Sequence, residues 1–346
     1  MKKVLFNAAF FLAGLLITGP VFAQNDHKNK NKDDHKREEP KFKKSKSYTK
    51  SYNLGSNDKV SLSNQFGEMR LNTWDKNEVK VDVSIVGKAD EEPRAQEILD
   101  RISIIDNKDG NTVSFKTKFA DEDDKDKKDK NRDNKDEHNN EGMEINYTVY
   151  LPATATLDAQ NQFGKMIIPD YRGEAEIECK FGSLTAGKIS NAKEVTVEFG
   201  EATFAHINGG KLNIKFSEAT VNKLSGDVKT DLSFSQVKLM IDNDVKSLDI
   251  HNSYSTVYLD LNKNFSATYD IHSSHGEFSN KTSFAIKEEG KEDRGYGPRF
   301  DRRYSGTSGS GTSKLKINSS FGEIVLGHDL KVDLSEKRKG KSTREI

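Results

Sequence analysis

The eight residues IKFSEATV, Ile214 to Val221, recur with small changes along much of the chain. They follow VEFGEATF, Val197 to Phe204, and precede LSFSQVKL, Leu232 to Leu239. Nine such phrases share one ring-bearing position, which falls at Phe66, Phe163, Phe181, Phe199, Phe216, Phe234, Tyr254, His275 and Phe321. From Phe163 onward the spacings between these positions are 18, 18, 17, 18, 20, 21 and 46 residues. A period near 20 residues over so many copies is typical of stacked repeats.

Each copy has the pattern of two short strands joined by a bend. Apolar residues alternate with polar ones up to Phe216, and the alternation then slips by one residue to Ala219 and Val221. A slip of one residue turns every later side chain of a straight strand to the opposite face. We therefore expect a bend directly after the ring-bearing residue. Glycine would supply an unusual backbone angle there in most copies, and serine replaces it in three, at Ser217, Ser235 and Ser255.

These features predict an all-β fold, a single-stranded parallel β-solenoid (β-helix) with coils of about 17–21 residues. The rings of the shared position are expected to stack as an internal column beside the corners. The column and corner residues are then Phe163, Gly164, Phe181, Gly182, Phe199, Gly200, Phe216, Phe234, Tyr254, His275, Phe321 and Gly322. Ahead of the coils, Glu91 to Ser103 has Pro93 near its start and apolar residues at helical spacing. This segment predicts a mixed N-terminal cap with one short helix.

The first residues have the pattern of a cleaved secretory signal. Lys2 and Lys3 precede an apolar run from Val4 to Ile17, and Ala23 ends the segment. No later stretch approaches the length of a membrane-spanning helix, so no integral membrane segment is expected after cleavage. The sequence therefore predicts export, to the periplasm, the outer cell surface or the medium.

Composition divides the rest of the chain. Two segments rich in Lys, Asp and Glu have almost no apolar residues and are expected to be disordered. The predicted boundaries are a signal peptide at 1–23, disordered charged segments at 24–50 and 120–141, a cap with the first coil at 51–119, a solenoid at 142–334 with a loop insert at 282–313, and a basic tail at 335–346.

Charge and cysteine content exclude several functions. The chain has 55 basic and 55 acidic residues, so it lacks the basic excess typical of nucleic-acid-binding proteins. Cys179 is the only cysteine, which rules out an internal disulfide. It aligns with Val197, Ile214 and Leu232 in the repeat, and we expect it to be a buried apolar residue. No motif in the sequence indicates a cofactor. The acidic insert lacks the sequence pattern of a calcium-binding EF-hand loop, so no metal site is expected there.

The repeated phrase resembles a known family. The phenylalanine and glycine of each corner, the secretory signal and NYTVYLPATATLDAQNQFG, Asn146 to Gly164, are similar to the bacterial "putative adhesin" family of unknown function. Members of that family are exported β-solenoids similar to the auto-transporter adhesin head domain. The resemblance covers roughly Tyr52 to Leu330. It implies surface adhesion by analogy and brings no catalytic residues.

Two places in the repeats could carry chemistry. Glu201 and Glu218 should lie one coil apart, near the strand spacing of about 4.8 Å, and paired carboxylates can hold a cation or act in a glycosidase. A solvated pair on a convex surface is the simpler interpretation. His275 falls in the ring position, with Asn252, Ser273 and Ser319 two residues before such positions. We interpret these residues as a hydrogen-bonded polar ladder rather than as a catalytic group.

The candidate ligand-binding segment lies in the second insert. RGYGPRFDRRY, Arg294 to Tyr304, combines guanidinium groups with rings, which suits anionic or sugar ligands. The expected binding residues are Arg294, Tyr296, Arg299, Phe300, Arg302, Arg303 and Tyr304.

The sequence thus favours a non-enzymatic, exported protein that binds an envelope protein or a glycan in an adhesion-like role. A β-helical polysaccharide lyase or hydrolase is the first alternative, and it would need acidic and basic side chains gathered across neighbouring coils. The second alternative is a partner protein in envelope stress or regulation.

Overall fold

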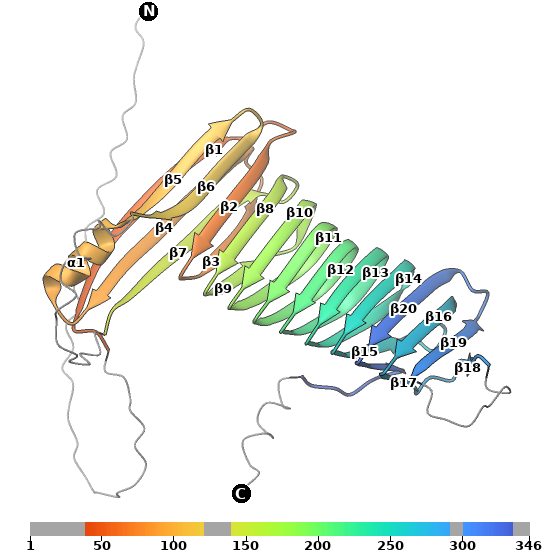
Figure 1. The fold of residues 1–346 in the computed structure, drawn as a ribbon. Coiled ribbons are helices and arrows are strands. Elements are labelled where there is room, and N and C mark those ends of the chain that lie inside the picture. The colour runs from red at the N-terminus through yellow and green to blue at the C-terminus, as the bar shows by residue number, and fades with distance from the viewer. Residues whose placement is uncertain (1–38, 121–139, 291–299, 335–346) are drawn as a thin grey trace, which may run out of the picture. The chain divides into compact units, whose positions relative to one another are not determined.

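Buried and exposed side chains alternate along the strands of this chain. In β10 (Tyr171–Lys180) every second residue is buried, which is the pattern of a strand with one face on the core. The computed structural model describes residues 39–120, 140–290 and 300–334. Within them the fold is all-β with one helix, and 21 strands join in one large mixed sheet (Figure 1). The predicted signal peptide, most of the 120–141 insert and the basic tail lie outside the described residues.

The N-terminal part pairs mostly in the antiparallel sense. β4 lies between β1 and β7, and β5 pairs with β6, whereas β2 is parallel to both β6 and β8. The elements are β1 (Phe42–Asn53), β2 (Lys59–Gln65), β3 (Met69–Trp74), β4 (Glu78–Ala89), α1 (Glu92–Asp100), β5 (Ile102–Asp109), β6 (Thr112–Phe119) and β7 (Gly142–Pro152). Antiparallel pairing here agrees with the mixed cap expected from the sequence.

The cap confirms one prediction and corrects another. α1 forms within the predicted helical segment and buries Ala95, Ile98 and Leu99. It lies close to β4, since a Cβ atom on Gly87 would come within 2.5 Å of the Ala95 carbonyl oxygen. β1, by contrast, begins at Phe42, inside the 24–50 segment predicted to be disordered. That prediction was wrong for residues 42–50, which pair with β4 as an edge strand.

The repeats pair in parallel and in register. Cys179 lies opposite Val197, Val197 opposite Ile214, and Ile214 opposite Leu232, as the sequence alignment predicts. Each long strand bends, so that β11 pairs through one half with β9 and through the other with β10. The strands of this part are β8 (Thr156–Gln162), β9 (Lys165–Ile168), β10, β11 (Ser183–Glu198), β12 (Glu201–Lys215), β13 (Glu218–Ser233), β14 (Gln236–Ser253) and β15 (Thr256–Leu261).

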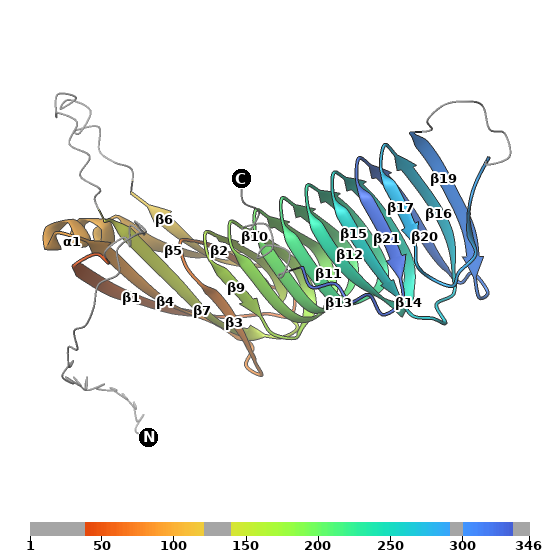
Figure 2. The same ribbon diagram turned by 90° about the horizontal axis from the view of Figure 1, so that it is seen from below.

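The C-terminal strands do not follow chain order. β20 lies between β14 and β16, and β21 lies between β15 and β17 (Figures 1 and 2). The last repeat of the sequence, β20 and β21, therefore lies between the β14–β15 strands and the β16–β17 strands, although β16 and β17 come earlier in the chain. The elements are β16 (Ala267–Ser274), β17 (Glu277–Asn280), β18 (Ile286–Glu288), β19 (Asp301–Ser308), β20 (Ser313–Ser320) and β21 (Glu323–Gly327).

This arrangement corrects the prediction of a loop insert at 282–313, because the insert contains the strands β18 and β19. β19 pairs antiparallel with β16, and β18 pairs with β19, so the described part of the insert covers the end of the sheet. Parallel pairing holds within the repeats and fails at this end.

Asparagine and serine residues interrupt the apolar interior near both ends of the repeats. Asn64 Nδ2 donates to Asn161 Oδ1 at 3.0 Å, and Asn252 Nδ2 donates to Ser319 Oγ at 2.9 Å. The predicted polar ladder is confirmed at Asn252 and Ser319, and Asn64 and Asn161 form an equivalent pair at the other end. The prediction fails at Ser273, whose Oγ has no hydrogen-bond partner among the described residues.

Cys179 gives a test of this interior. Its side chain is 1% exposed, and burial raises the pKa of the thiol from 9.0 to about 11. A thiolate is the reactive form, so iodoacetamide should alkylate the native protein at pH 8 at least about 100-fold more slowly than the protein unfolded in guanidinium. The stabilisation from burying the neutral thiol should be complete below pH 9 and lost as the pH rises to about 11. Rapid alkylation of the native thiol would contradict its place in the core.

Candidate functional site

Ten rings stack in one continuous row across the strands, which we call the aromatic ladder. Neighbouring ring centroids are 4.9–5.0 Å apart, close to the spacing of paired strands, and neighbouring planes differ by 1–18°. At the N-terminal end, Phe119 meets the first ring edge-on. In spatial order the members are Phe66, Phe163, Phe181, Phe199, Phe216, Phe234, Tyr254, Phe321, His275 and Phe300.

The aromatic ladder lies on the surface, so the prediction of an internal column was wrong. From Phe163 to Tyr254, and again at Phe321, the side chains are 45–52% exposed, whereas Phe204 on β12 is fully buried. The reason is the backbone at the ring residue itself, whose φ lies between 49° and 64° in all nine repeats. This left-handed conformation turns the side chain out of the corner while the aliphatic residues on both sides point inward.

The left-handed corner is held by hydrogen bonds between neighbouring repeats. The N–H of Phe181 donates to the Glu198 carbonyl at 2.9 Å, and the N–H of Phe216 donates to the Ser233 carbonyl in the same way. A bulky residue in this conformation costs about 1–2 kcal/mol, and glycine, asparagine or aspartate adopts it more easily. Stacking of neighbouring rings returns about 0.5–1.5 kcal/mol per pair. The corner geometry alone therefore does not call for a phenyl ring at these positions.

The corner glycines have a different role from the one predicted. None of those that follow a ladder residue has a positive φ. A Cβ atom on Gly164 would lie 1.9 Å from the Gly67 carbonyl oxygen, and one on Gly182 would lie 1.9 Å from the Gly164 oxygen. At these positions glycine is required because the backbone of the neighbouring repeat comes close, not because of an unusual backbone angle.

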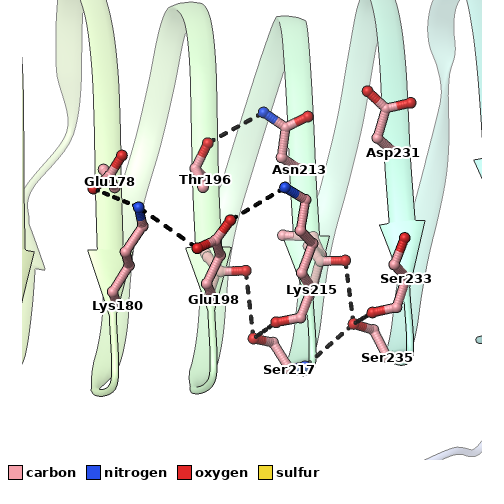
Figure 3. A network of polar contacts seen from close by, with 12 residues as sticks. Glu178, Lys180, Thr196, Glu198, Asn213, Lys215, Ser217, Asp231, Ser233 and Ser235 are labelled. Carbon is pink, nitrogen blue, oxygen red and sulfur yellow. Dashed lines mark hydrogen bonds and ion pairs between the residues drawn. The ribbon is translucent and has the colours of Figure 1, made fainter.

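Serine takes the same corner position in the middle repeats. Ser235 Oγ donates to the Ser233 carbonyl at 2.7 Å and accepts the N–H of Ser217 at 3.2 Å. Ser255 Oγ accepts the N–H of Ser235 in the same manner. Figure 3 shows the bonds of Ser217 and Ser235. The serine hydroxyls are thus held in place by hydrogen bonds to the backbone.

A shallow groove runs beside the aromatic ladder. Its volume is about 350 Å³ between Phe216 and Thr256. Phe216, Phe234 and Tyr254 form one wall, Ser217 and Ser235 form the floor, and the other wall consists of Glu218, Gln236 and Thr256. We call it the ladder groove.

The second wall belongs to a longer line of side chains, the polar row. Its members occupy matching positions on neighbouring strands and include the predicted pair Glu201 and Glu218, which are direct neighbours. The polar row consists of Lys165, Ser183, Glu201, Glu218, Gln236, Thr256, Glu323 and Glu277. Within the described ranges, no group of three or more His, Cys, Asp or Glu side chains is placed to hold a metal ion.

The opposite flank of the aromatic ladder changes character along its length. In the N-terminal half, Glu198 bridges Lys180 at 3.5 Å and Lys215 at 3.2 Å, and Asn213 Nδ2 donates to Thr196 Oγ1 at 3.1 Å (Figure 3). Beyond Phe216 the corresponding residues are Ser233, Ser253, Ser320 and Ser274. The charges alternate and pair in the first half. In the second half the position directly before each ring is serine, while Asp231 and His251 continue the line of Thr196 and Asn213.

The predicted binding segment is only partly described. Arg294, Tyr296 and Arg299 lie outside the described residues. Phe300 stacks on His275 at 5.0 Å and so extends the aromatic ladder. The other described members, Arg302, Arg303 and Tyr304, belong to strand β19 rather than to a loop.

Tyr304 and His275 also take positions that the sequence did not predict. The Tyr304 ring packs against Phe278 with centroids 4.6 Å apart. Arg302 donates a hydrogen bond to the Tyr304 side chain, which raises the pKa of the guanidinium. His275 is exposed between Phe321 and Phe300, not in an inward position. His275 thus continues the aromatic ladder, whereas Tyr304 packs against Phe278 outside it.

The ladder residues and the neighbouring pair Glu201 and Glu218 are recognisable in the sequence, but the outward orientation of the rings was not predicted. One signal was available. The slip in alternation falls between Phe216 and Ala219, so the ring residue need not belong to either inward set. The polar residues on both sides of the ring, such as Lys215 and Glu218, are also consistent with an exposed corner.

No protein-family model and no curated protein matches the sequence. Among solved structures, a "putative adhesin" from Bacteroides fragilis is 10% identical with a TM-score of 0.37, over 81% of this chain and 97% of that one. A "putative cell adhesion protein" from Clostridium sporogenes is 15% identical with a TM-score of 0.24, over 83% and 100%. A "Putative lipid binding protein" from Parabacteroides distasonis is 9% identical with a TM-score of 0.30, over 81% and 96%. Similarity this low does not establish a shared fold or function, and membership of the adhesin family stays a prediction.

Proposed function

We propose that this chain is an exported, non-enzymatic binding protein in which a parallel β-solenoid presents the aromatic ladder to a partner at the cell envelope. The observation that carries the proposal is the row of half-exposed rings at left-handed corners. Contiguous apolar surface of this kind on a soluble protein marks an interaction site more often than a structural one. The role is adhesion-like because the surface is long, regular and open.

No helix in the described part of the chain has the length and apolar character needed to cross a bilayer. Polar side chains border the aromatic ladder on both sides, including Lys180, Lys215 and Glu218. A partner that contacts the ladder must therefore match a narrow apolar line bordered by hydrogen-bonding groups.

Removing rings from the aromatic ladder should abolish binding and leave the fold intact. The test variant is Phe181→Asn/Phe199→Asn/Phe216→Asn, because asparagine tolerates the left-handed corner. On a panel of immobilised glycans and purified bacterial envelope fractions, the variant should bind at least about tenfold more weakly than the mature protein, a change of about 1.4 kcal/mol. The matched control, Lys193→Ala/Lys211→Ala/Lys229→Ala, alters the same region of the stack away from the ladder and should bind normally.

Circular dichroism and thermal melting should show that both variants remain folded, so that a loss of binding is not caused by unfolding. Equal binding by the ladder variant and the unmodified protein would contradict the proposal. So would the absence of any binding by the unmodified protein across the whole panel.

The enzyme alternative has its own test at the polar row. A retaining glycosidase places two carboxylates about 5–5.5 Å apart, and Glu201 and Glu218 are neighbours across paired strands. We expect no release of reducing ends from the panel polysaccharides, and no change in binding for Glu201→Gln/Glu218→Gln. Turnover that disappears in this double variant would replace the binding role with a catalytic one.

A further inference from the structure

We infer that the ladder groove binds a linear, uncharged polysaccharide, and this inference rests on the binding function proposed above. Four features of the groove point to this ligand class: two chemically unlike walls, a regular repeat, the lack of an open strand edge, and the net negative charge of the polar row.

The two walls match the two kinds of surface on a sugar ring. The aromatic wall offers apolar ring surface, and the opposite wall offers the carboxylate of Glu218, the amide of Gln236 and the hydroxyl of Thr256. Phe216, Phe234 and Tyr254 are 49–52% exposed, although neighbouring centroids are only 4.9 Å apart. Each ring therefore leaves part of its face open to the C–H groups of a sugar, while the sugar hydroxyls face the polar wall.

The repeat favours a polymer over a small molecule. Nine ring-to-ring steps of 4.9–5.0 Å give an aromatic ladder about 44 Å long. Each step presents one ring and one member of the polar row in matching positions. A chain of similar units gains a contact at each step, and its affinity rises with length because later contacts are intramolecular.

A polypeptide strand fits this groove poorly. Strand addition needs an open sheet edge, whereas the aromatic ladder crosses the strands, and the repeats β10 to β14 are paired on both sides. The corner N–H groups are also used, for example by the bond from Gln236 N to the Ser217 carbonyl at 3.0 Å. A peptide in the groove would leave its own backbone groups unpaired, whereas sugar hydroxyls can bind side chains and water.

Charge disfavours polyanions and favours neutral sugars. The polar row holds four glutamates and one lysine, a net of −3, which repels phosphate and uronate polymers. From Phe234 to Phe321, the position directly before each ring on the other flank is a serine, and Asp231, whose carboxylate pairs with Lys211 at 2.9 Å, lies two residues before the first of these serines. Gln236 Oε1 makes no hydrogen bond within the described chain, so turning this amide toward a ligand hydroxyl breaks none at that oxygen.

Titration calorimetry of the mature protein tests the inference with defined probes. The uncharged probes are cellohexaose, laminarihexaose, mannohexaose and N-acetylchitohexaose, and the charged probe is the hexamer of galacturonic acid. At least one uncharged hexasaccharide should bind, at least about tenfold more tightly than its disaccharide. The affinity should not change with NaCl concentration, because no net charge is neutralised on binding.

Two variants locate the site. Phe216→Asn/Phe234→Asn should weaken binding of that hexasaccharide by at least about tenfold, and Gln236→Ala by about three- to tenfold, the range of one hydrogen bond. The matched control is Lys229→Ala, which lies on β13 outside the groove, and this variant should bind normally.

The outcomes separate this inference from the proposed function. If ladder-dependent binding to envelope fractions persists but no uncharged hexasaccharide binds, the polysaccharide inference is wrong and the proposed function stands. Tighter binding of the galacturonate hexamer than of any uncharged hexasaccharide would also overturn the polysaccharide inference. Ladder-dependent self-association in analytical ultracentrifugation, with no hexasaccharide binding, would assign the groove to a second copy of the chain. If no binding of any kind depends on the ladder, both proposals fail.

Discussion

Replacing Gly182 with alanine is expected to lower the free energy of unfolding by about 3 kcal/mol, the upper part of the usual range for overpacking. The added Cβ would lie 1.9 Å from the Gly164 carbonyl oxygen, which is backbone and cannot rotate away. That oxygen also accepts the N–H of Ser183 at 3.3 Å, so moving it disturbs the pairing of the repeats. Urea denaturation followed by circular dichroism measures the change.

Two controls isolate the clash. Ser235→Ala changes the same corner position in another repeat, where a Cβ atom is already present, and should cost about 1 kcal/mol through the lost hydrogen bonds. Gly110→Ala meets no atom within 4 Å but has φ +53°, so it should cost about 1–2 kcal/mol from backbone strain alone. If Gly182→Ala were no more destabilising than either control, close approach of backbones would not explain the glycine corners.

Deleting residues 313–346 is expected to release the preceding segment from the fold. Among the described strands, β16 pairs only with β19 and β20, and β17 pairs only with β21. Without β20 and β21, the strands β16 to β19 therefore lose their hydrogen-bonded connection to β14 and β15. Leu315, Ile317, Ile324 and Leu326 are each at most 1% exposed. A fully buried side chain of this kind contributes about 1.5–3 kcal/mol, so their loss alone removes about 6 kcal/mol or more.

Limited proteolysis with mass spectrometry measures the result. Cleavage should concentrate within residues 262–312, while the repeats up to β14 stay resistant because stacked repeats depend chiefly on their immediate neighbours. A chain ending at Leu334 is the matched control and should resist proteolysis as the full chain does. Protection of 262–312 in the deleted protein would show that the inserted last repeat does not hold this end together.

The repeat architecture was largely predictable because its information is local and periodic. Alternation and period placed Cys179, Val197 and Ile214 in register, and helical spacing placed α1. The insertion of β20 before β16 was not predictable. The 46-residue spacing from His275 to Phe321 shows that a segment intervenes, but nothing in it says which strand edge the last repeat joins.

Two further errors have physical causes. The lysine-rich β1 has the composition of a disordered segment, yet lysines are tolerated and even favoured on an edge strand. Tyr48 and Tyr52 anchor it through hydrogen bonds from their hydroxyls to Asp106 at 2.6 and 2.5 Å. The ring orientation failed because hydrophobicity favours burial, and a left-handed backbone at a phenylalanine is too uncommon to expect from sequence.

The candidate binding surface was therefore predictable in its membership and not in its orientation. The repeated aromatic position named the ladder residues, but as core. The segment Arg294 to Tyr304, chosen for its arginines and rings, contributes Phe300 to the end of the ladder. The polar row became a wall of a groove only once the rings were placed outside, opposite Gln236 and Thr256.

Hydroxyl-radical footprinting with mass spectrometry tests the central claim most directly, since it reports the solvent exposure of individual rings. In the free mature protein, Phe181, Phe199 and Phe234 should be oxidised readily, and Phe204, which is fully buried, should serve as the unreactive internal reference. On saturation with the bound hexasaccharide or envelope fraction, the ladder rings should become protected while exposed rings elsewhere do not. Ladder rings as unreactive as Phe204 in the free protein, or equally reactive in the bound one, would contradict the account.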